Sequence, residues 1–220
     1  MQDGEFSVIV LISGNGSNLQ AIIDQIQQGK LRVSLCAVIS DRPDAYGLTR
    51  AAKAGIPTHV IDYKQYPDRA RFNAALQQQI DAYRPDLIVL AGFMRILTAE
   101  FVQHYLGKMI NIHPSLLPKF QGLHTHRRVL EAGDAEHGAS VHYVTPELDS
   151  GPVILQGRIP VLAADTPASL QQRVHQVEYP IYPTAIQQIA AGQVTFRNNQ
   201  VYYEDLAMQD AQREYPVELP

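Results

Sequence analysis

The sequence predicts an α/β fold, a doubly wound and mostly parallel sheet of the Rossmann-like type with antiparallel strands in its C-terminal part. Three observations predict it. Apolar, β-branched runs alternate with amphipathic stretches through residues 6–112, which is the pattern of repeated strand–helix units. Glycine and proline stand where these stretches end, as structure breakers do. After Pro114 the alternation stops, and two strand-like runs flank a turn-rich segment.

The first half is expected to contain five strands and four helices in alternation. The run at 6–12 breaks at a glycine-rich loop, after which Leu19, Ile22, Ile23 and Ile26 recur at helical spacing, so strand, loop and helix follow one another. The unbroken apolar run at 87–91 predicts a strand buried on both faces. Strands are expected at 6–12, 33–40, 58–61, 87–91 and 109–112, with helices ending at Gly29 and spanning 45–54, 68–83 and 98–105.

The second half is expected to hold a short helix at 126–132, strands at 140–144 and 153–161, and a long helix at 167–191. Pro180 and Pro183 fall inside that helix and are expected to kink or interrupt it. Runs at 194–197 and 200–203 flank Asn198-Asn199, a pair typical of a two-residue hairpin turn. We predict one domain at 1–204 and a polar tail at 205–220.

Composition excludes several classes of protein. The 220 residues carry a formal charge of −4 with no basic run, which argues against nucleic-acid binding. No apolar stretch reaches the roughly 18 residues of a membrane span, and the acidic start is unlike a signal peptide, so a cytoplasmic protein is expected. Cys36 is the single cysteine, which excludes a disulfide framework or a thiolate zinc cluster.

A glycine loop at residues 14–18 (Gly-Asn-Gly-Ser-Asn) lies between the first strand and its helix. Backbone N–H groups at a helix start, with the positive end of the helix dipole, form an anion site. Leu19 stands where a dinucleotide fingerprint needs its third glycine, and the lysine of a P-loop is missing. The loop is therefore either a phosphate site or simply a tight turn.

The fifth strand ends in the sequence Asn111-Ile112-His113-Pro114. Residues two apart in a strand share a face, so Asn111 and His113 point the same way. Ligands of open parallel sheets bind beyond the carboxyl ends of the strands. An amide and an imidazolium aimed at one point can stabilise an oxyanion. The alternative interpretation is a buried histidine with a structural role.

Asp149 lies in a turn between the two C-terminal strands. An aspartate is common in turns, but a carboxylate near His113 would favour the imidazolium. His142 alternates with apolar neighbours and is expected to face the same site. His124 and His126 form an H-x-H pair, but no further ligands stand at metal spacing, so no metal site is predicted. His59 and His104 are interpreted as structural.

Five segments together resemble the phosphoribosylglycinamide formyltransferases, which use 10-formyltetrahydrofolate as co-substrate. They lie at 12–22, 90–97, 111–118, 122–126 and 148–154, and the resemblance covers Ser7 to about Gly192. It implies a formyltransferase-type fold and direct transfer of a formyl group to the amine of 5'-phosphoribosylglycinamide, in de novo purine biosynthesis, without a metal. One departure is Gln121, where many relatives have proline; we expect no effect on the chemistry.

The resemblance also implies roles for individual residues. Asn111, His113 and Asp149 would be the catalytic trio. The substrate would be bound by Gly16, Ser17 and Asn18, which hold its phosphate, and by His175, Gln176, Val177 and Glu178. The folate would be bound by Arg69 near its glutamate tail, by Met94, Arg95, Ile96 and Leu97 through backbone groups, by Asn111, and by the loop of Thr145, Pro146, Glu147, Leu148 and Asp149.

Three alternatives compete with this interpretation. A methionyl-tRNA formyltransferase would need a further C-terminal domain and a surface for RNA. A formyltetrahydrofolate hydrolase would carry an extra N-terminal domain, whereas the first strand here begins near Phe6. A non-catalytic nucleotide-binding protein would explain the glycine loop but not Asn111, His113 and Asp149. The expected partners are therefore the two small-molecule substrates, with no nucleic acid or membrane; a weak homodimer is left open.

Overall fold

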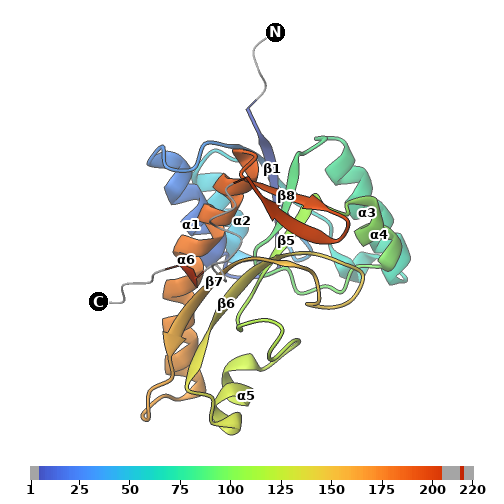
Figure 1. The fold of residues 1–220 in the computed structure, drawn as a ribbon. Coiled ribbons are helices and arrows are strands. Elements are labelled where there is room, and N and C mark those ends of the chain that lie inside the picture. Colours follow the sequence, from blue (N-terminus) through green and yellow to red (C-terminus); the bar gives the residue numbers. More distant parts are fainter. Residues whose placement is uncertain (1–4, 205–213, 216–220) are drawn as a thin grey trace. The chain divides into compact units, whose positions relative to one another are not determined.

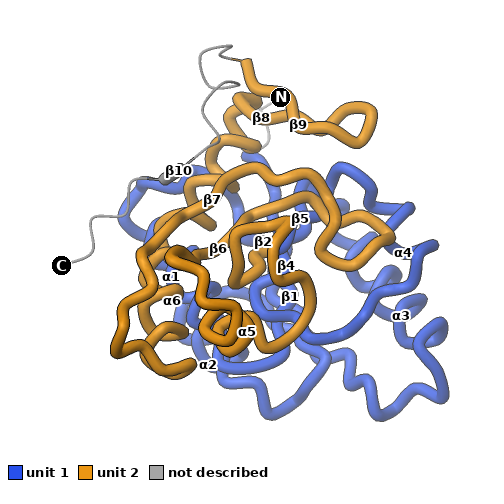
Figure 2. Tube along the Cα trace, turned by 60° about the horizontal axis from the view of Figure 1, so that its bottom comes forward, with its two compact units in different colours: residues 1–111 blue, residues 112–220 orange. Residues whose placement is uncertain are grey.

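The structure, a computed structural model, describes residues 5–204 and 214–215 (Figure 1). The chain divides into two compact units, residues 1–111 and 112–220 (Figure 2). The predicted single domain at 1–204 stays a prediction. The predicted tail at 205–220 lies, apart from residues 214–215, outside the described residues, as do the first four residues.

The first unit is built on parallel strands in the order β5-β4-β1-β2-β3. β1 lies at the centre, and Val8 through Ile12 are fully buried, as the β-branched run predicts. The strands are β1 (Ser7–Ile12), β2 (Ser34–Ser40), β3 (Thr58–Val60), β4 (Leu87–Leu90) and β5 (Met109–His113), whose last two residues belong to the second unit.

Helices cover both sides of this sheet, with α1 and α2 on one side and α3 and α4 on the other (Figure 1). Their side-chain caps fit the sequence, since Asp68 and Thr98 accept hydrogen bonds from the backbone at the start of α3 and α4. The helices are α1 (Ser17–Gln27), α2 (Tyr46–Lys53), α3 (Arg69–Asp81) and α4 (Ala99–His104), with a 3-10 turn at Tyr63–Gln65.

The second unit consists of antiparallel strands packed against a long helix. β6 (Glu136–Tyr143) and β7 (Val153–Pro160) pair antiparallel, and β10 (Glu214–Tyr215) pairs parallel with β7. α6 (Pro167–Ala190) packs on both β6 and β7, and α5 (Thr125–Ala132) contacts α6. Asn198 and Asn199 have φ values of 51° and 57° and turn β8 (Val194–Arg197) into β9 (Gln200–Tyr203), as predicted.

The predicted fold class is confirmed, and the structure differs from the prediction in details. β6 begins at Glu136 rather than at residue 140. A Cβ on Gly138 would lie 1.9 Å from the carbonyl oxygen of Gly157. Glycine is therefore required at position 138, because the two paired strands approach each other closely there. α6 also continues through Pro180 and Pro183 instead of being interrupted. Among the described residues, no helix is long and apolar enough to cross a membrane.

Candidate active site

The glycine loop joins β1 to α1 in the first unit. Gly16 adopts a left-handed conformation with φ 73°, and α1 begins at the next residue with no side chain capping its N-terminus. A Cβ on Gly16 would lie 2.7 Å from Cα of Gly47 in α2, so glycine is required for both its φ and its close approach. The arrangement is that of a helix N-terminus open to an anion.

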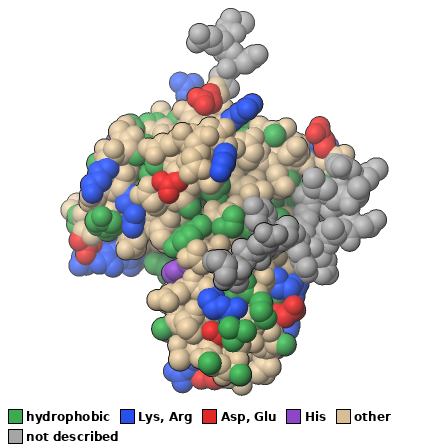
Figure 3. All heavy atoms as spheres, turned by 90° about the vertical axis from the view of Figure 1, so that its left-hand side faces the viewer, with side chains coloured by type: hydrophobic (Ala, Val, Ile, Leu, Met, Phe, Trp, Pro, Cys, Tyr) green, Lys and Arg blue, Asp and Glu red, His purple; other side chains and the backbone are tan. Residues whose placement is uncertain are grey.

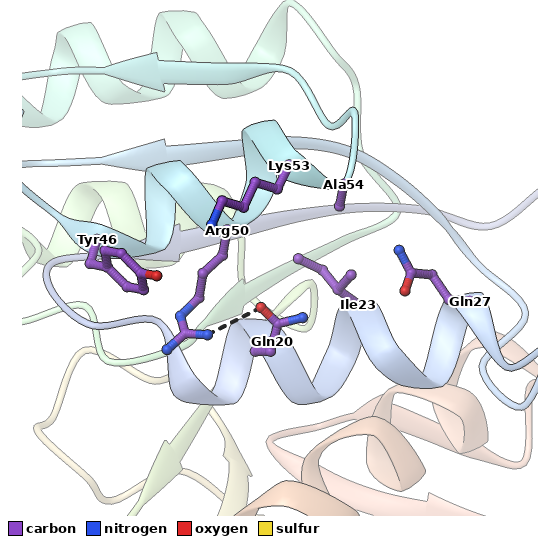
Figure 4. Close-up of a pocket in the computed structure, with 7 residues that line it drawn as sticks. All are labelled: Gln20, Ile23, Gln27, Tyr46, Arg50, Lys53 and Ala54. Atoms are coloured by element: carbon purple, nitrogen blue, oxygen red, sulfur yellow. Dashed lines mark hydrogen bonds between the residues drawn. The ribbon is translucent and has the colours of Figure 1, made fainter.

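Arg50 of α2 supports this loop from the side. Its Nε donates to the carbonyl oxygen of Asn15 at 2.9 Å, its Nη2 to Oδ1 of Asn15 at 3.0 Å, and its Nη1 to Oε1 of Gln20 at 3.2 Å. Figure 4 shows Arg50 reaching across from α2 toward Gln20 on α1. The cavity between the two helices has a volume of about 210 Å³ and is lined by Gln20, Ile23, Gln27, Tyr46, Arg50, Lys53 and Ala54.

The segment 92–97 follows β4 and lies beside the start of the glycine loop. The backbone N–H of Met94 donates to Oγ of Ser13 at 2.8 Å, and the N–H of Ser13 donates to the carbonyl oxygen of Gly92 at 3.1 Å. Met94 and Ile96 are 66% and 60% exposed. Two predicted ligand segments, 16–18 and 94–97, are therefore brought to the same edge of the first unit.

Other predicted residues of the first unit have different surroundings. The Arg95 guanidinium pairs with the buried carboxylate of Asp41 and lies 4.1 Å from the ring centroid of Tyr63. Its side chain therefore holds the 92–97 segment to its own unit. Arg69 is exposed on the first turn of α3.

His113 ends β5 and is buried, with 5% of its surface exposed. Its Nε2 lies 2.9 Å from the carbonyl oxygen of Phe120. Because a carbonyl only accepts, Nε2 carries a proton. Its Nδ1 lies 3.4 Å from Oδ2 of Asp149. Nδ1 therefore faces a carboxylate oxygen and Nε2 a carbonyl oxygen. Asn111, two residues earlier on β5, is half-buried on the same face of the strand.

Asp149 is held in an unusual backbone conformation. Its φ is 50°, which is uncommon for a residue other than glycine. Its Oδ2 also accepts the backbone N–H of Gly122 at 2.9 Å, and only 10% of its side chain is exposed. The predicted proximity of Asp149 to His113 is confirmed by this geometry, while the catalytic roles of both stay predictions.

His142 is the second histidine near Asp149. It is 2% exposed, its Nδ1 donates to the carbonyl oxygen of Tyr143, and its Nε2 lies 3.9 Å from Oδ1 of Asp149. Burial lowers the pKa of His142 to about 4, so it is neutral at pH 7. Of these two histidines, His113 is the one that lies closer to the Asp149 carboxylate.

The structure pairs His126 with His137, a residue to which the sequence assigned no role. His126 Nδ1 and His137 Nε2 are 3.0 Å apart. Burial lowers the pKa of each to about 4. The H-x-H pair is thus split, because His124 is exposed and precedes α5 while His126 turns toward β6. No group of metal-ligating side chains is found in the part of the chain that the structure describes.

The four predicted substrate residues of α6 do not share one environment. Val177 is fully buried against the sheet, where a Cβ on Gly157 would meet its side chain. Glu178 is 5% exposed, His175 is half-buried and Gln176 is exposed. Burial lowers the pKa of His175. Val177 therefore packs the core, and the polar members are the candidates for ligand contact.

Charged side chains of both signs are interspersed on the face shown in Figure 3, with no continuous basic stripe over its described atoms.

Comparison with known proteins agrees with these features. A family model described as "Formyl transferase" matches residues 6–186. Phosphoribosylglycinamide formyltransferase of Escherichia coli (strain K12) is 51% identical over 198 residues, covering 90% of this chain and 93% of that protein. The trifunctional purine biosynthetic protein adenosine-3 of Bos taurus is 45% identical over 90% of this chain and 20% of its own length. The structure of phosphoribosylglycinamide formyltransferase from Coxiella burnetii superposes with a TM-score of 0.87 at 56% identity, covering 90% of this chain and 93% of that one. The chain therefore belongs to the formyl transferase family.

Proposed function

We propose that this chain transfers a formyl group from 10-formyltetrahydrofolate to the amine of 5'-phosphoribosylglycinamide, in de novo purine biosynthesis. The relatives that it matches along nearly their whole length are formyltransferases of that acceptor. The observation that carries the proposal is the buried pair of His113 and Asp149. A binding protein has no need of such a pair, whereas acyl transfer uses a charge that is held ready where an oxyanion forms.

The reaction balances without a covalent enzyme intermediate. The glycinamide nitrogen attacks the formyl carbon, and the carbonyl electrons move to the formyl oxygen. When the tetrahedral centre collapses, the bond to the folate nitrogen breaks. The attacking amine loses one proton and the folate nitrogen gains one. Asn111 and protonated His113 would donate to the oxyanion, and one such donor typically contributes about 3 kcal/mol to lowering the barrier.

His113 has to exchange a partner before it can act in this way. Both of its ring nitrogens face protein acceptors, Phe120 through Nε2 and Asp149 through Nδ1. The carboxylate is the stronger acceptor for a charged donor. We therefore propose that the formyl oxygen replaces the Phe120 carbonyl at Nε2, while Asp149 keeps Nδ1. Asp149 would also organise a water molecule that relays the amine proton.

Binding roles follow from the chemistry of each segment. The N-terminus of α1 with Gly16, Ser17 and Asn18 would hold the phosphate. Glu178, with its polar neighbours His175 and Gln176, would recognise the glycinamide ribonucleotide, while Val177 packs the core beneath them. The folate would be bound through backbone groups and exposed apolar side chains of Met94, Arg95, Ile96 and Leu97. The turn of residues 145–149 would form the folate-binding loop. Arg69 would attract the glutamate tail of the folate. A cytoplasmic location belongs to the same proposal.

A formyl-transfer assay tests the proposal, with release of tetrahydrofolate followed by absorbance and product identified by mass. Three acceptors are compared: glycinamide ribonucleotide, its dephosphorylated nucleoside, and water alone. We expect rapid transfer to the ribonucleotide, much weaker binding of the nucleoside by calorimetry, and negligible hydrolysis. Equal rates with water would make the protein a hydrolase. Absence of turnover with every acceptor would leave only a binding protein.

A further inference from the structure

Gln121 connects two segments of the second unit that are distant in sequence. It lies in the loop 114–124 between β5 and α5, and its side-chain Nε2 donates to the carbonyl oxygen of Asp149 and to Oγ of Ser150, each at 3.1 Å. Ser150 Oγ in turn donates to the carbonyl oxygen of Leu148 at 3.1 Å. One amide group therefore bridges the loop 114–124 to the turn 147–150.

The base of Gln121 is itself anchored. Arg128 of α5 donates through Nη1 to the carbonyl oxygens of Gln121 and Leu123, and its guanidinium carbon lies 5.5 Å from the ring centroid of Phe120. Because α5 holds the main chain of Gln121, the side-chain amide of Gln121 can fix the turn 147–150 relative to α5. Gln121 is itself an exposed residue, so the anchored main chain is what limits the conformational freedom that is lost when its side chain makes the two bonds.

The bonds from Gln121 act on the residue that faces His113. Gly122, the next residue, donates its N–H to Oδ2 of Asp149, so residues 121 and 122 hold Asp149 at its main-chain oxygen and at its carboxylate. Asp149 has a φ of 50°, and a conformation of this kind persists only where its surroundings enforce it. Two consecutive residues of the loop 114–124 therefore hold the Asp149 carboxylate in the position where it faces Nδ1 of His113.

We propose that Gln121 is a positioning residue for formyl transfer, which fixes the Asp149 turn so that the carboxylate faces His113. The proposal deepens the proposed function and rests on it. In this role Gln121 acts through Asp149, to whose main-chain oxygen it donates. The role requires a side chain with an N–H donor at this length and without negative charge, because both of its partners accept.

Activity tests use variants that keep the size of the side chain. Gln121→Met removes the donor, and Gln121→Glu replaces it with an acceptor. Gln172→Met, on an exposed position of α6, is the matched control. We expect kcat of both Gln121 variants to fall about tenfold, the scale of one ordinary hydrogen bond. KM for glycinamide ribonucleotide should be unchanged, because its phosphate is bound elsewhere. Parental kcat in Gln121→Met would overturn the proposal.

A double-mutant cycle with Ser150→Ala tests whether the two residues act together. Ser150→Ala removes one of the two acceptors and should reduce kcat less than Gln121→Met does. The double variant should equal Gln121→Met alone. If the losses in kcat of the two single variants multiply in the double variant, Gln121 acts independently of the turn, and the proposal is contradicted.

A measurement that does not depend on activity separates this proposal from the proposed function. Amide hydrogen exchange at Gly122, followed by NMR in the full chain, reports directly on the bond to Asp149. Gln121→Met should accelerate that exchange about tenfold, whereas Gln172→Met should not change it. The parent protein could fail to transfer a formyl group while Gln121→Met still accelerates exchange at Gly122. In that case the proposed function would be wrong, but the structural connection between Gln121 and the Asp149 turn would be supported. Unchanged exchange would refute the connection itself.

Discussion

Nδ1 of His113 lies 3.4 Å from Oδ2 of Asp149, although one residue ends a strand and the other lies in a turn far along the chain. The loop 114–124 brings them together, because Phe120 binds one side of the imidazole and Gly122 binds the carboxylate. The histidine is thereby held between the neutral carbonyl of Phe120 and the carboxylate of Asp149.

Replacing Asp149 with asparagine tests what the charge contributes. Asp149→Asn keeps an oxygen for the Gly122 N–H but removes the negative charge beside Nδ1. We expect kcat to fall at least tenfold, because a neutral amide replaces the charged acceptor that faces Nδ1 of His113. Steady-state kinetics at saturating substrates measures the effect, and circular dichroism checks that the fold is kept. A variant with the parental kcat would show that the negative charge contributes nothing to the reaction.

Gly16→Ala tests the geometry of the glycine loop. The φ of 73° and the 2.7 Å approach of a Cβ to Gly47 should together destabilise the fold by about 2 kcal/mol and weaken binding of glycinamide ribonucleotide. Gly14→Ala is the control, because no heavy atom lies within 4 Å of its Cβ; its effect on the free energy of unfolding should stay within about 0.5 kcal/mol. Urea denaturation compares the two. Equal stabilities would mean that the loop tolerates a side chain at position 16.

Stability should depend on pH through the buried histidines. His126, His137 and His142 have pKa values lowered by burial to about 4. Between pH 6.5 and 4 the unfolded chain binds protons that the folded chain does not, so the free energy of unfolding is highest above pH 6.5 and falls as the pH is lowered through this window. His137→Gln should reduce the slope by up to about 1.4 kcal/mol per pH unit. Urea denaturation at several pH values measures it, and a flat profile in the parent would contradict the assignment.

Arg95 offers a test of how the 92–97 segment is held. Arg95→Ala leaves the Asp41 carboxylate, 1% exposed, without its cation, and we expect a loss of about 3 kcal/mol in the free energy of unfolding. Arg42→Ala breaks a pair with Asp44 that is exposed on both sides, and should produce no measurable change. Thermal unfolding of the two variants side by side provides the comparison. A loss no larger than that of Arg42→Ala would show that Asp41 finds another partner.

Local patterns predicted most of the fold. β1 through β5 and α1 through α4 start and end within about two residues of their expected positions, since β-branched runs and glycine or proline stops act over a few neighbouring residues. The predicted start of β6, at residue 140, was wrong. The requirement for glycine at position 138 comes from Gly157 on the partner strand, which no pattern of neighbouring residues reveals. The 3-10 turn at Tyr63–Gln65 was not predicted either.

The types of residue in the candidate site could be predicted from the sequence better than the contacts between those residues. Alternation along β5 placed Asn111 and His113 on one face without knowledge of the rest of the chain. The contact between His126 and His137, and the bonds of Gln121 to the Asp149 turn, join segments that no local pattern relates. The sequence analysis expects no effect of Gln121 on the chemistry, and the bonds of Gln121 to the Asp149 turn give a reason to test that expectation.

The most direct measurement is the single-turnover rate of formyl transfer with both substrates saturating, in the parent and in His113→Ala. With binding saturated, the rate reports the chemical step alone. The account predicts a loss of at least a hundredfold, the usual effect of removing a donor to a developing oxyanion, with the fold intact by circular dichroism. A His113→Ala protein that transfers the formyl group at close to the parental rate would contradict it.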